Sequence, residues 1–234
     1  MTLKGSGPAT DWEEIDRFES NNGGATDGGV GWIPYPEEAM QRASHALAVD
    51  GDVWVIDPVD AAGVDTLFAE LGDVAGVVVL LDRHKRDAGT IARRHDVAVH
   101  VPAPLSDIAG DIDAPVERFQ GELADTGYRT QTVVDNFAWT EVALYDESRG
   151  VLVVPEAVGT TEYFLASGER LGVHPALRLT PPRKLARVEP DRILVGHGAG
   201  VHGDATRALR DAVSGARGRT PGLYLKNLKT FLPV

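Results

Sequence analysis

The chain has 234 residues, with 23 lysines and arginines against 35 aspartates and glutamates, and it contains no cysteine. This length and an apolar share of 43% suffice for a buried core and argue against wholesale disorder. The formal charge of −12 argues against nucleic acid and anionic membranes as partners, and the lack of cysteine excludes disulfides and thiolate metal sites.

The first 31 residues are rich in glycine, asparagine, aspartate and serine, and runs such as Asn21-Asn22-Gly23-Gly24 are turn or loop signals. We therefore predict a flexible or extended N-terminal arm over 1–31, followed by a single domain over 32–234. Proline and two glutamates at 36–39 predict the start of a short helix, because proline suits a first turn and acids favour its positive end.

Regular structure is predicted from residue 44 onward. The dipeptide Asp50-Gly51 accepts positive φ angles and indicates a two-residue β-hairpin between the apolar runs on either side. Apolar residues at helical spacing then alternate with β-branched runs, which predicts α/β layering with buried strands. The expected elements are a hairpin of 44–49 and 52–56, a helix over 64–71, a strand over 77–81, a helix over 88–94 and a strand over 97–101.

The second half of the chain returns to strands and then to a helix. A polar turn over 146–150 separates two apolar runs and predicts a second hairpin. The proline- and arginine-rich segment 175–190 predicts a loop with a short helix. The other expected elements are a strand over 130–135, the hairpin of 141–145 and 151–154, a strand over 192–196, a helix over 204–214 and a last short strand or arm over 223–231.

Three segments place residues with metal-binding or acid-base chemistry directly after predicted strands. They read Asp82-Arg83-His84-Lys85-Arg86-Asp87-Ala88, Pro155-Glu156-Ala157 and Gly196-His197-Gly198. In this order, across most of residues 44 to 214, they resemble the metallo-β-lactamase fold superfamily. The resemblance implies an α/β fold, a four-layer αββα sandwich, with a metal site in the cleft where the strand ends of the two sheets meet.

The metal motif of that family is degraded in this chain. Members with an active site carry His-x-His-x-Asp-His, and alignment through Asp87 places Arg83 and Lys85 at the first two histidines. The resemblance also places Glu156 at the bridging aspartate and His197 at the final histidine. Charged arginine and lysine offer no lone pair to a metal and repel it, so we do not expect a di-zinc hydrolase.

Two interpretations of the cleft stay open. In the favoured one there is no cofactor, and the cations of Arg83 and Lys85 pair with the carboxylates of Asp87 and Glu156. The cleft is then vestigial, or it presents a guanidinium to a small anionic ligand. In the alternative, Asp87, Glu156 and His197 hold one divalent metal, Zn, Mn or Fe, for hydrolysis of an ester, thioester or phosphate.

Neighbouring residues extend this cleft. His84 could assist as a ligand if its loop tilts, and Asp57 either supports the ligands from behind or caps the turn at Pro58. The catalytic residues stay unknown, and a structural or protein-interaction role, with Trp139 as a homodimer anchor or a core residue, is the third interpretation. The candidate cleft residues are Arg83, His84, Lys85, Asp87, Glu156, His197 and Asp57.

The remaining histidines give weaker signals. His100 lies in an apolar strand and is expected inside the fold, whereas His174 precedes a proline and is expected in solvent. His45 and His95 have no partner nearby in the sequence. His202 could reach the cleft, but its distance from His197 in the sequence is not typical of a metal site.

The location of the protein is predicted from what the sequence lacks. The longest uninterrupted apolar run, 76–81, is far short of the roughly 20 residues that a membrane-spanning helix requires. No charged-then-apolar leader opens the chain, so we expect a soluble cytoplasmic protein. Only five of the 23 cations are lysine, and aspartate outnumbers glutamate. This composition is halophile-like, because high salt screens repulsion among carboxylates, with codon bias of a GC-rich genome as the alternative.

Overall fold

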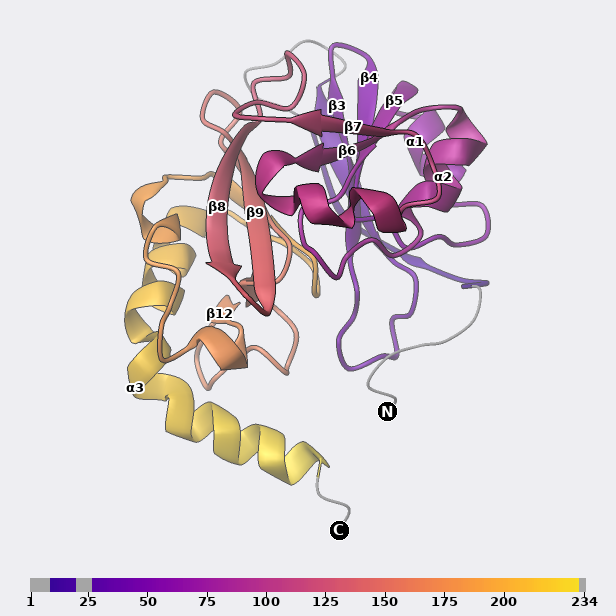
Figure 1. Ribbon diagram of the computed structural model, residues 1–234. Helices are drawn as coiled ribbons and strands as arrows, with labels where there is room; N and C mark the ends of the chain where they lie inside the picture. The colour runs from indigo at the N-terminus through magenta and orange to yellow at the C-terminus, as the bar shows by residue number, and fades with distance from the viewer. Residues whose placement is uncertain (1–8, 20–26, 232–234) are drawn as a thin grey trace.

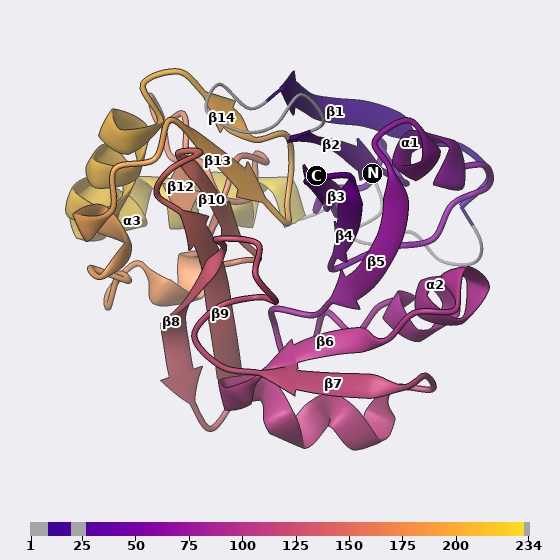
Figure 2. The same ribbon diagram turned by 90° about the horizontal axis from the view of Figure 1, so that it is seen from above.

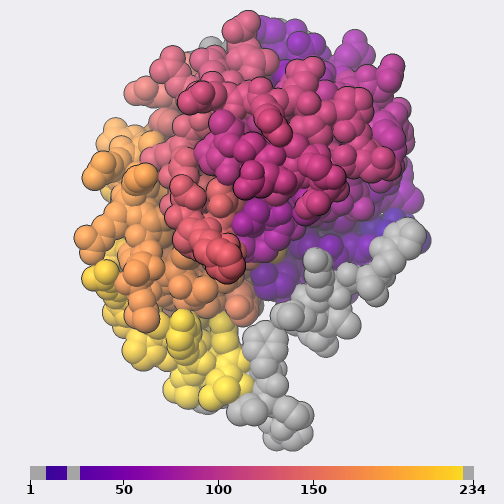
Figure 3. Space-filling view, viewed as in Figure 1, coloured from indigo at the N-terminus to yellow at the C-terminus, as the bar shows by residue number. Residues whose placement is uncertain are grey.

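The computed structural model describes residues 9–19 and 27–231. Two β-sheets pack against each other and helices cover their outer faces, which gives the αββα sandwich that the family resemblance implies (Figures 1 and 2). The first and second halves of the chain occupy separate halves of the visible surface, each built around its own sheet (Figure 3).

The seven-stranded sheet follows the chain order from one edge to the other. Its first four strands pair antiparallel, and β4 to β7 pair parallel. The helical segments of this half are α1 (Asp65–Ala69), α2 (Ala88–His95) and the 3-10 segment η1 (Ala103–Asp111). The strands are β1 (Glu13–Glu19), β2 (Gly28–Ile33), β3 (Ser44–Val49), β4 (Asp52–Ile56), β5 (Asp73–Val78), β6 (Val99–Pro102) and β7 (Val116–Phe119).

The five-stranded sheet has the order β14-β13-β10-β9-β8, and only β10 and β13 pair parallel. A small two-stranded sheet and α3 (Ala205–Phe231) complete this half, with short 3-10 turns η2 (Pro175–Leu177) and η3 (Leu185–Arg187). The strands are β8 (Arg129–Asn136), β9 (Trp139–Asp146), β10 (Val151–Val154), β11 (Val158–Gly159), β12 (Gly172–Val173), β13 (Arg192–Val195) and β14 (Val201–His202).

Side-chain alternation along the strands creates the four layers. In β4, Trp54 and Ile56 enter the core between the sheets, whereas Val53 and Val55 pack with α1 and α2. In β10, Val153 joins the core between the sheets and Leu152 packs with α3. Each central strand is therefore buried on both faces, which explains why these strands are continuous apolar runs in the sequence.

Both predicted hairpins, the helices near 64–71 and 88–94, and the strand leading to residue 196 are present in the structure. Three expectations need correction. Residues 13–19 and 28–33 are paired strands, and β2 crosses the expected boundary at residue 31, so the paired part of the arm belongs to the first sheet. The rest of the arm, 1–8 and 20–26, lies outside the described residues.

Residues 36–39 form turns rather than a helix. The buried carboxylate of Glu38 accepts hydrogen bonds from the backbone and side chain of Arg42, which stabilises a turn instead. Residues 223–231 continue α3 despite Pro221, because Leu223 is fully buried and Asn227 donates a hydrogen bond to Tyr163 O. Among the described residues, no helix combines the length and apolar character needed to cross a membrane.

Candidate functional site

The ends of strands from both sheets bring together two histidines and a glutamate. His84 lies in the loop after β5, Glu156 follows β10, and His197 follows β13. One ligand atom from each residue lies within 4.8 Å of the other two, and all three residues are buried. In the described part of the chain this is the one group of histidines and carboxylates with the geometry to hold a metal ion.

Both imidazole rings are fixed through Nδ1. His84 Nδ1 lies 3.1 Å from Asp57 Oδ2, and His197 Nδ1 lies 2.9 Å from the carbonyl oxygen of Met40. A carboxylate and a carbonyl only accept hydrogen bonds, so Nδ1 of each ring carries a proton. The other nitrogen, Nε2, faces Glu156 Oε2, at 3.4 Å from His84 and 4.0 Å from His197.

The Nε2 atom of His197 is buried and has no hydrogen-bond partner among the described residues. Burial, together with the electrostatic effect of His84 and Arg86, holds the pKa of His197 well below its ordinary value. The ring is therefore neutral at pH 7. A lone pair beside a carboxylate without a donor between them is a place where a cation or a water molecule fits.

Glu156 is the charged centre of the group. Burial raises the pKa of its carboxyl, but the contact with His84 and the positive charge of Arg83 outweigh burial and hold this pKa well below its usual range. The carboxylate is thus ionised at neutral pH. The lone pair of His197 and the negative charge of Glu156 therefore face each other.

Two guanidinium groups border this point. Arg86 donates from Nη1 to the carbonyls of Ala43 and Asp57 at 2.7 and 2.8 Å, and from Nη2 to Gly196 O at 3.3 Å. Its Nη2 also lies 3.2 Å from His84 Nε2, the nitrogen that faces Glu156.

Arg83 approaches from the solvent side. Its Nε donates to Glu156 Oε2 at 3.0 Å, which is the ion pair expected from the sequence. The guanidinium also stacks on the ring of Trp139, 4.1 Å from the ring centre. Arg83 therefore contacts the carboxylate and the aromatic wall of the site together.

Two other candidates from the sequence point away from the group. Lys85 pairs with Asp111 at 2.6 Å, and Asp87 Oδ2 accepts from the backbone N–H of Asp60. The inward positions are 84 and 86, one residue later than alignment through Asp87 assumes. His84 therefore takes the place expected for Asp87 in the three-residue set, and the second cation at the site is Arg86 instead of Lys85.

His174 was expected in solvent, but only 13% of its side chain is exposed. Its Nε2 lies 3.5 Å from Glu156 Oε1, and its Nδ1 accepts from the backbone of Ala176. Burial lowers the pKa of His174 to about 4. Its ring packs edge-on against Trp139, so the segment before η2 forms part of the site wall.

Sequence reasoning also missed Glu141, which is fully buried behind Glu156. One of its oxygens accepts from the backbone N–H groups of Glu156 and Ala157, each at 2.8 Å, and the other accepts from Trp139 Nε1 at 2.8 Å. Burial raises the pKa of Glu141 to about 7. A glutamate in an otherwise apolar strand is the one sequence signal that could have revealed it.

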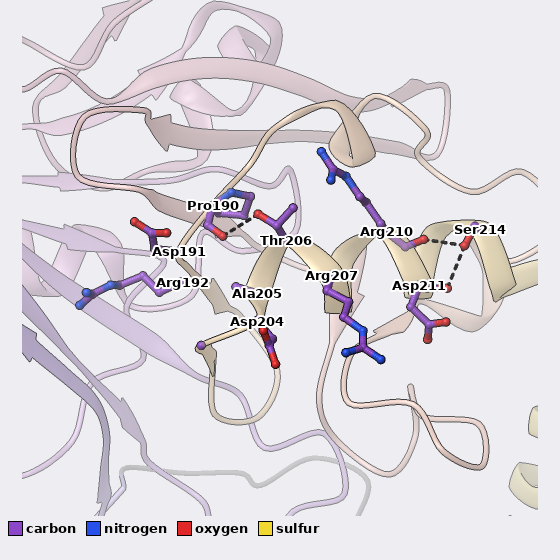
Figure 4. Close-up of a pocket in the computed structure, with 11 residues that line it drawn as sticks. Pro190, Asp191, Arg192, Asp204, Ala205, Thr206, Arg207, Arg210, Asp211 and Ser214 are labelled. Carbon is purple, nitrogen blue, oxygen red and sulfur yellow. Dashed lines mark hydrogen bonds between the residues drawn. The ribbon is translucent and has the colours of Figure 1, made fainter.

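A cavity of about 940 Å³ lies at the opposite end of β13, where α3 begins (Figure 4). Its charges offset one another, since Asp191, Asp204 and Asp211 line it together with Arg192, Arg207 and Arg210. It is separate from the histidine and glutamate group, which lies at the carboxyl ends of β10 and β13.

Comparison with known proteins supports the fold. No family model and no curated protein matches the chain. Solved structures that resemble it include DIM-1 metallo-β-lactamase, at 12% identity over 88% of this chain and 99% of that chain, with a TM-score of 0.54. The chemotaxis sensor ODP from T. denticola gives 10% identity, 93% and 100% coverage and a TM-score of 0.60.

A mutant of the flavo di-iron protein from Thermotoga maritima gives 16% identity over 82% of this chain and 54% of that chain, with a TM-score of 0.54. Identities this low establish a common architecture without a common activity. The likeness confirms the four-layer sandwich that the family resemblance of the sequence implies.

Proposed function

Because the chain has the metallo-β-lactamase fold, we propose that it binds a single divalent cation through His84, Glu156 and His197 and uses it as a hydrolytic centre. The observation that carries this proposal is the buried Nε2 atom of His197, which has no hydrogen-bond partner among the described residues and faces the ionised carboxylate of Glu156. The fixed Nδ1 protons add support, because metal-binding histidines usually donate their other N–H to a carboxylate or carbonyl.

The donor set favours one ion over two. Two imidazoles and one carboxylate suit Zn, Mn or Fe and leave coordination positions open for water or substrate. Among the described residues no second carboxylate points into the group, since Asp87 is turned toward Asp60, so a second ion would lack a charged ligand. The guanidinium of Arg86, 3.2 Å from His84 Nε2, also repels the single ion, by an amount on the order of several kcal/mol at a separation near 4 Å.

When bound, such an ion would supply a water of lowered pKa for attack on an ester, thioester or phosphate. The residues of this chain provide the rest. Asp57 and Met40 hold the two rings in orientation, and Glu156 keeps a negative charge at the centre. Arg83, on the solvent side, is placed to bind an anionic group of the substrate.

A second function is favoured by the two guanidinium groups. Arg83 and Arg86 carry two positive charges against the carboxylates of Glu156 and Asp57, so the group is electrically balanced without an ion. Arg86 contacts four groups, three of them backbone carbonyls. On this basis the site would be a non-standard ligand-binding cleft, or a vestige, that retains the fold without hydrolysis.

Metal content separates the two functions. The protein is purified without chelators or immobilised-metal columns, and its metal is measured before and after incubation with Zn²⁺ or Mn²⁺. The single-ion centre predicts one ion per chain, lost in His197→Gln and retained in His100→Gln, a matched histidine on β6. Circular dichroism confirms that both variants fold. No stoichiometric ion in the wild type would overturn this proposal and favour the metal-free cleft.

A further inference from the structure

Arg83 occupies the same oxygen that a bound ion would need. Its Nε donates to Glu156 Oε2 at 3.0 Å, and this oxygen also faces the Nε2 atoms of both site histidines. We propose that Arg83 couples the binding of a small oxyanion to the binding of the cation: an anion that takes the guanidinium frees Glu156 for the ion. The inference rests on the proposed single-ion site and adds its regulation.

The side chain of Arg83 has more room to change its conformation than that of Glu156, because it is more exposed. The side chain of Arg83 is 39% exposed, whereas that of Glu156 is 10% exposed. The guanidinium rests on the face of Trp139, which supports it by a cation–π contact that does not depend on Glu156. It can therefore turn its N–H groups from the carboxylate to a ligand in solvent and remain on the ring.

The ring that carries Arg83 is itself anchored to Glu156. Trp139 Nε1 donates to Glu141, and Glu141 accepts from the backbone N–H groups of Glu156 and Ala157. The contacts thus form a closed ring of four residues, in which each one touches the next: Arg83, Trp139, Glu141 and Glu156. Its stack and its hydrogen bonds hold the guanidinium within reach of the cation site in both states.

Neither neighbouring cation can play this part. Arg86 donates to three backbone carbonyls, which hold it in place. Lys85 pairs with Asp111, outside the group. A planar guanidinium on the solvent side suits a carboxylate, sulfate or phosphate, because two of its N–H groups match two oxygens of the anion.

Thermodynamic linkage makes the proposal measurable. If an oxyanion raises the affinity for the cation by some factor, the cation raises the affinity for the anion by the same factor, and typical factors are roughly 5 to 150. We expect the affinity for the cation to change by a factor on the order of ten, because the anion removes one charge-assisted contact between Arg83 and Glu156.

The test is calorimetric titration of Zn²⁺ into the metal-free protein, in sodium sulfate and in sodium chloride of equal ionic strength. In the wild type, sulfate is expected to tighten zinc binding about tenfold. Arg83→Gln is expected to bind zinc more tightly in chloride and to lose the sulfate effect. Lys85→Gln removes one positive charge from the same loop and is expected to behave like the wild type.

Several outcomes would overturn the coupling. If the wild type binds zinc and Arg83→Gln binds it no more tightly, Arg83 does not compete for Glu156, although the single-ion site stands. Equal tightening in Arg83→Gln and Lys85→Gln would reduce the effect to net charge. If only Arg83→Gln binds zinc, Arg83 does compete for Glu156, but the wild type holds no resident ion. If the wild type, Arg83→Gln and Lys85→Gln all fail to bind zinc, both proposals are refuted.

Discussion

Asp16 offers a sharp test of how the N-terminal strand supports the site. It lies at an irregularity in the pairing of β1 with β2, with a left-handed backbone (φ 55°) and a side chain that is 3% exposed. Its two oxygens each accept from Gly200 N at 2.8 Å, one is 2.9 Å from His202 Nε2, and the other is 3.2 Å from His45 Nε2. Asp16 therefore ties β1 to β3 and to the loop after His197.

Asp16→Asn removes the charge while keeping the size and the tolerance of a left-handed backbone. Whichever oxygen becomes an amide loses a histidine contact and presents a donor to another donor. A net hydrogen bond to a charged group contributes about 1.5–3 kcal/mol, so we expect the free energy of unfolding to fall by about 3 kcal/mol at pH 7.

The effect should depend on pH in a defined direction. Burial raises the pKa of Asp16, but the hydrogen bonds of His202, His45 and Gly200 hold it well below its ordinary value of 3.8. A carboxylate whose pKa is lowered by folding stabilises the fold above the pKa of the unfolded chain and loses this contribution as pH falls toward the folded pKa. The difference between wild type and Asp16→Asn should therefore shrink as the pH falls below about 4.

Urea unfolding at each pH, followed by circular dichroism, measures this difference. Asp50→Asn is the matched control, because Asp50 also has a left-handed backbone (φ 54°) but is exposed in the β3–β4 turn. Its expected change is within about 0.5 kcal/mol. A similar loss in both variants, or a loss in Asp16→Asn that does not shrink in acid, would refute the assigned role of the buried charge.

Three other changes test the packing and the charges away from the site. Leu223→Ala in α3 should lower the free energy of unfolding by about 2–5 kcal/mol in urea, because this side chain is fully buried. Arg178→Met should cost about 3–5 kcal/mol in the same assay, because it leaves the carboxylate of Glu169, 2.5 Å away, in a buried position without its main partner. Burial lowers the pKa of His100 below its ordinary 6.5, so the unfolded chain binds the proton first and wild-type stability should fall as pH drops below about 6.5. His100→Gln should reduce this slope, and an unchanged slope would contradict the assignment.

The fold was largely accessible from the sequence because its central strands are buried on both faces. The apolar runs around Val77 and Val153 predict buried strands, and Asp50-Gly51 predicts the first hairpin, since each signal is local. The edge strand β1 and the second half of α3 gave no such signal. Both depend on distant contacts, Asp16 with Gly200 in one case and Asn227 with Tyr163 in the other.

The site was predicted in part. The family resemblance singled out Glu156, His197 and Arg83 and gave His84 only as a helper, because alignment through Asp87 assigned the inward positions one residue too early. The alternation of inward and outward side chains around His84 could have been read from the sequence. The contact of His197 with the Met40 carbonyl could not, because Met40 lies in a turn far away in the sequence. Side-chain direction in a loop depends on tertiary hydrogen bonds that no local pattern encodes.

Arg86 explains how this site can keep its architecture with fewer metal ligands. An imidazole at that position would contribute a lone pair and need an ion, whereas the guanidinium contributes donors and a charge of its own. Those donors join the ends of β3 and β4 to the end of β13 through Ala43 O, Asp57 O and Gly196 O. The two sheets are therefore held together at the cleft without an ion. A cation bound by His84, Glu156 and His197 would therefore not be needed for folding. Its affinity could be determined by the competition of Arg83 for Glu156.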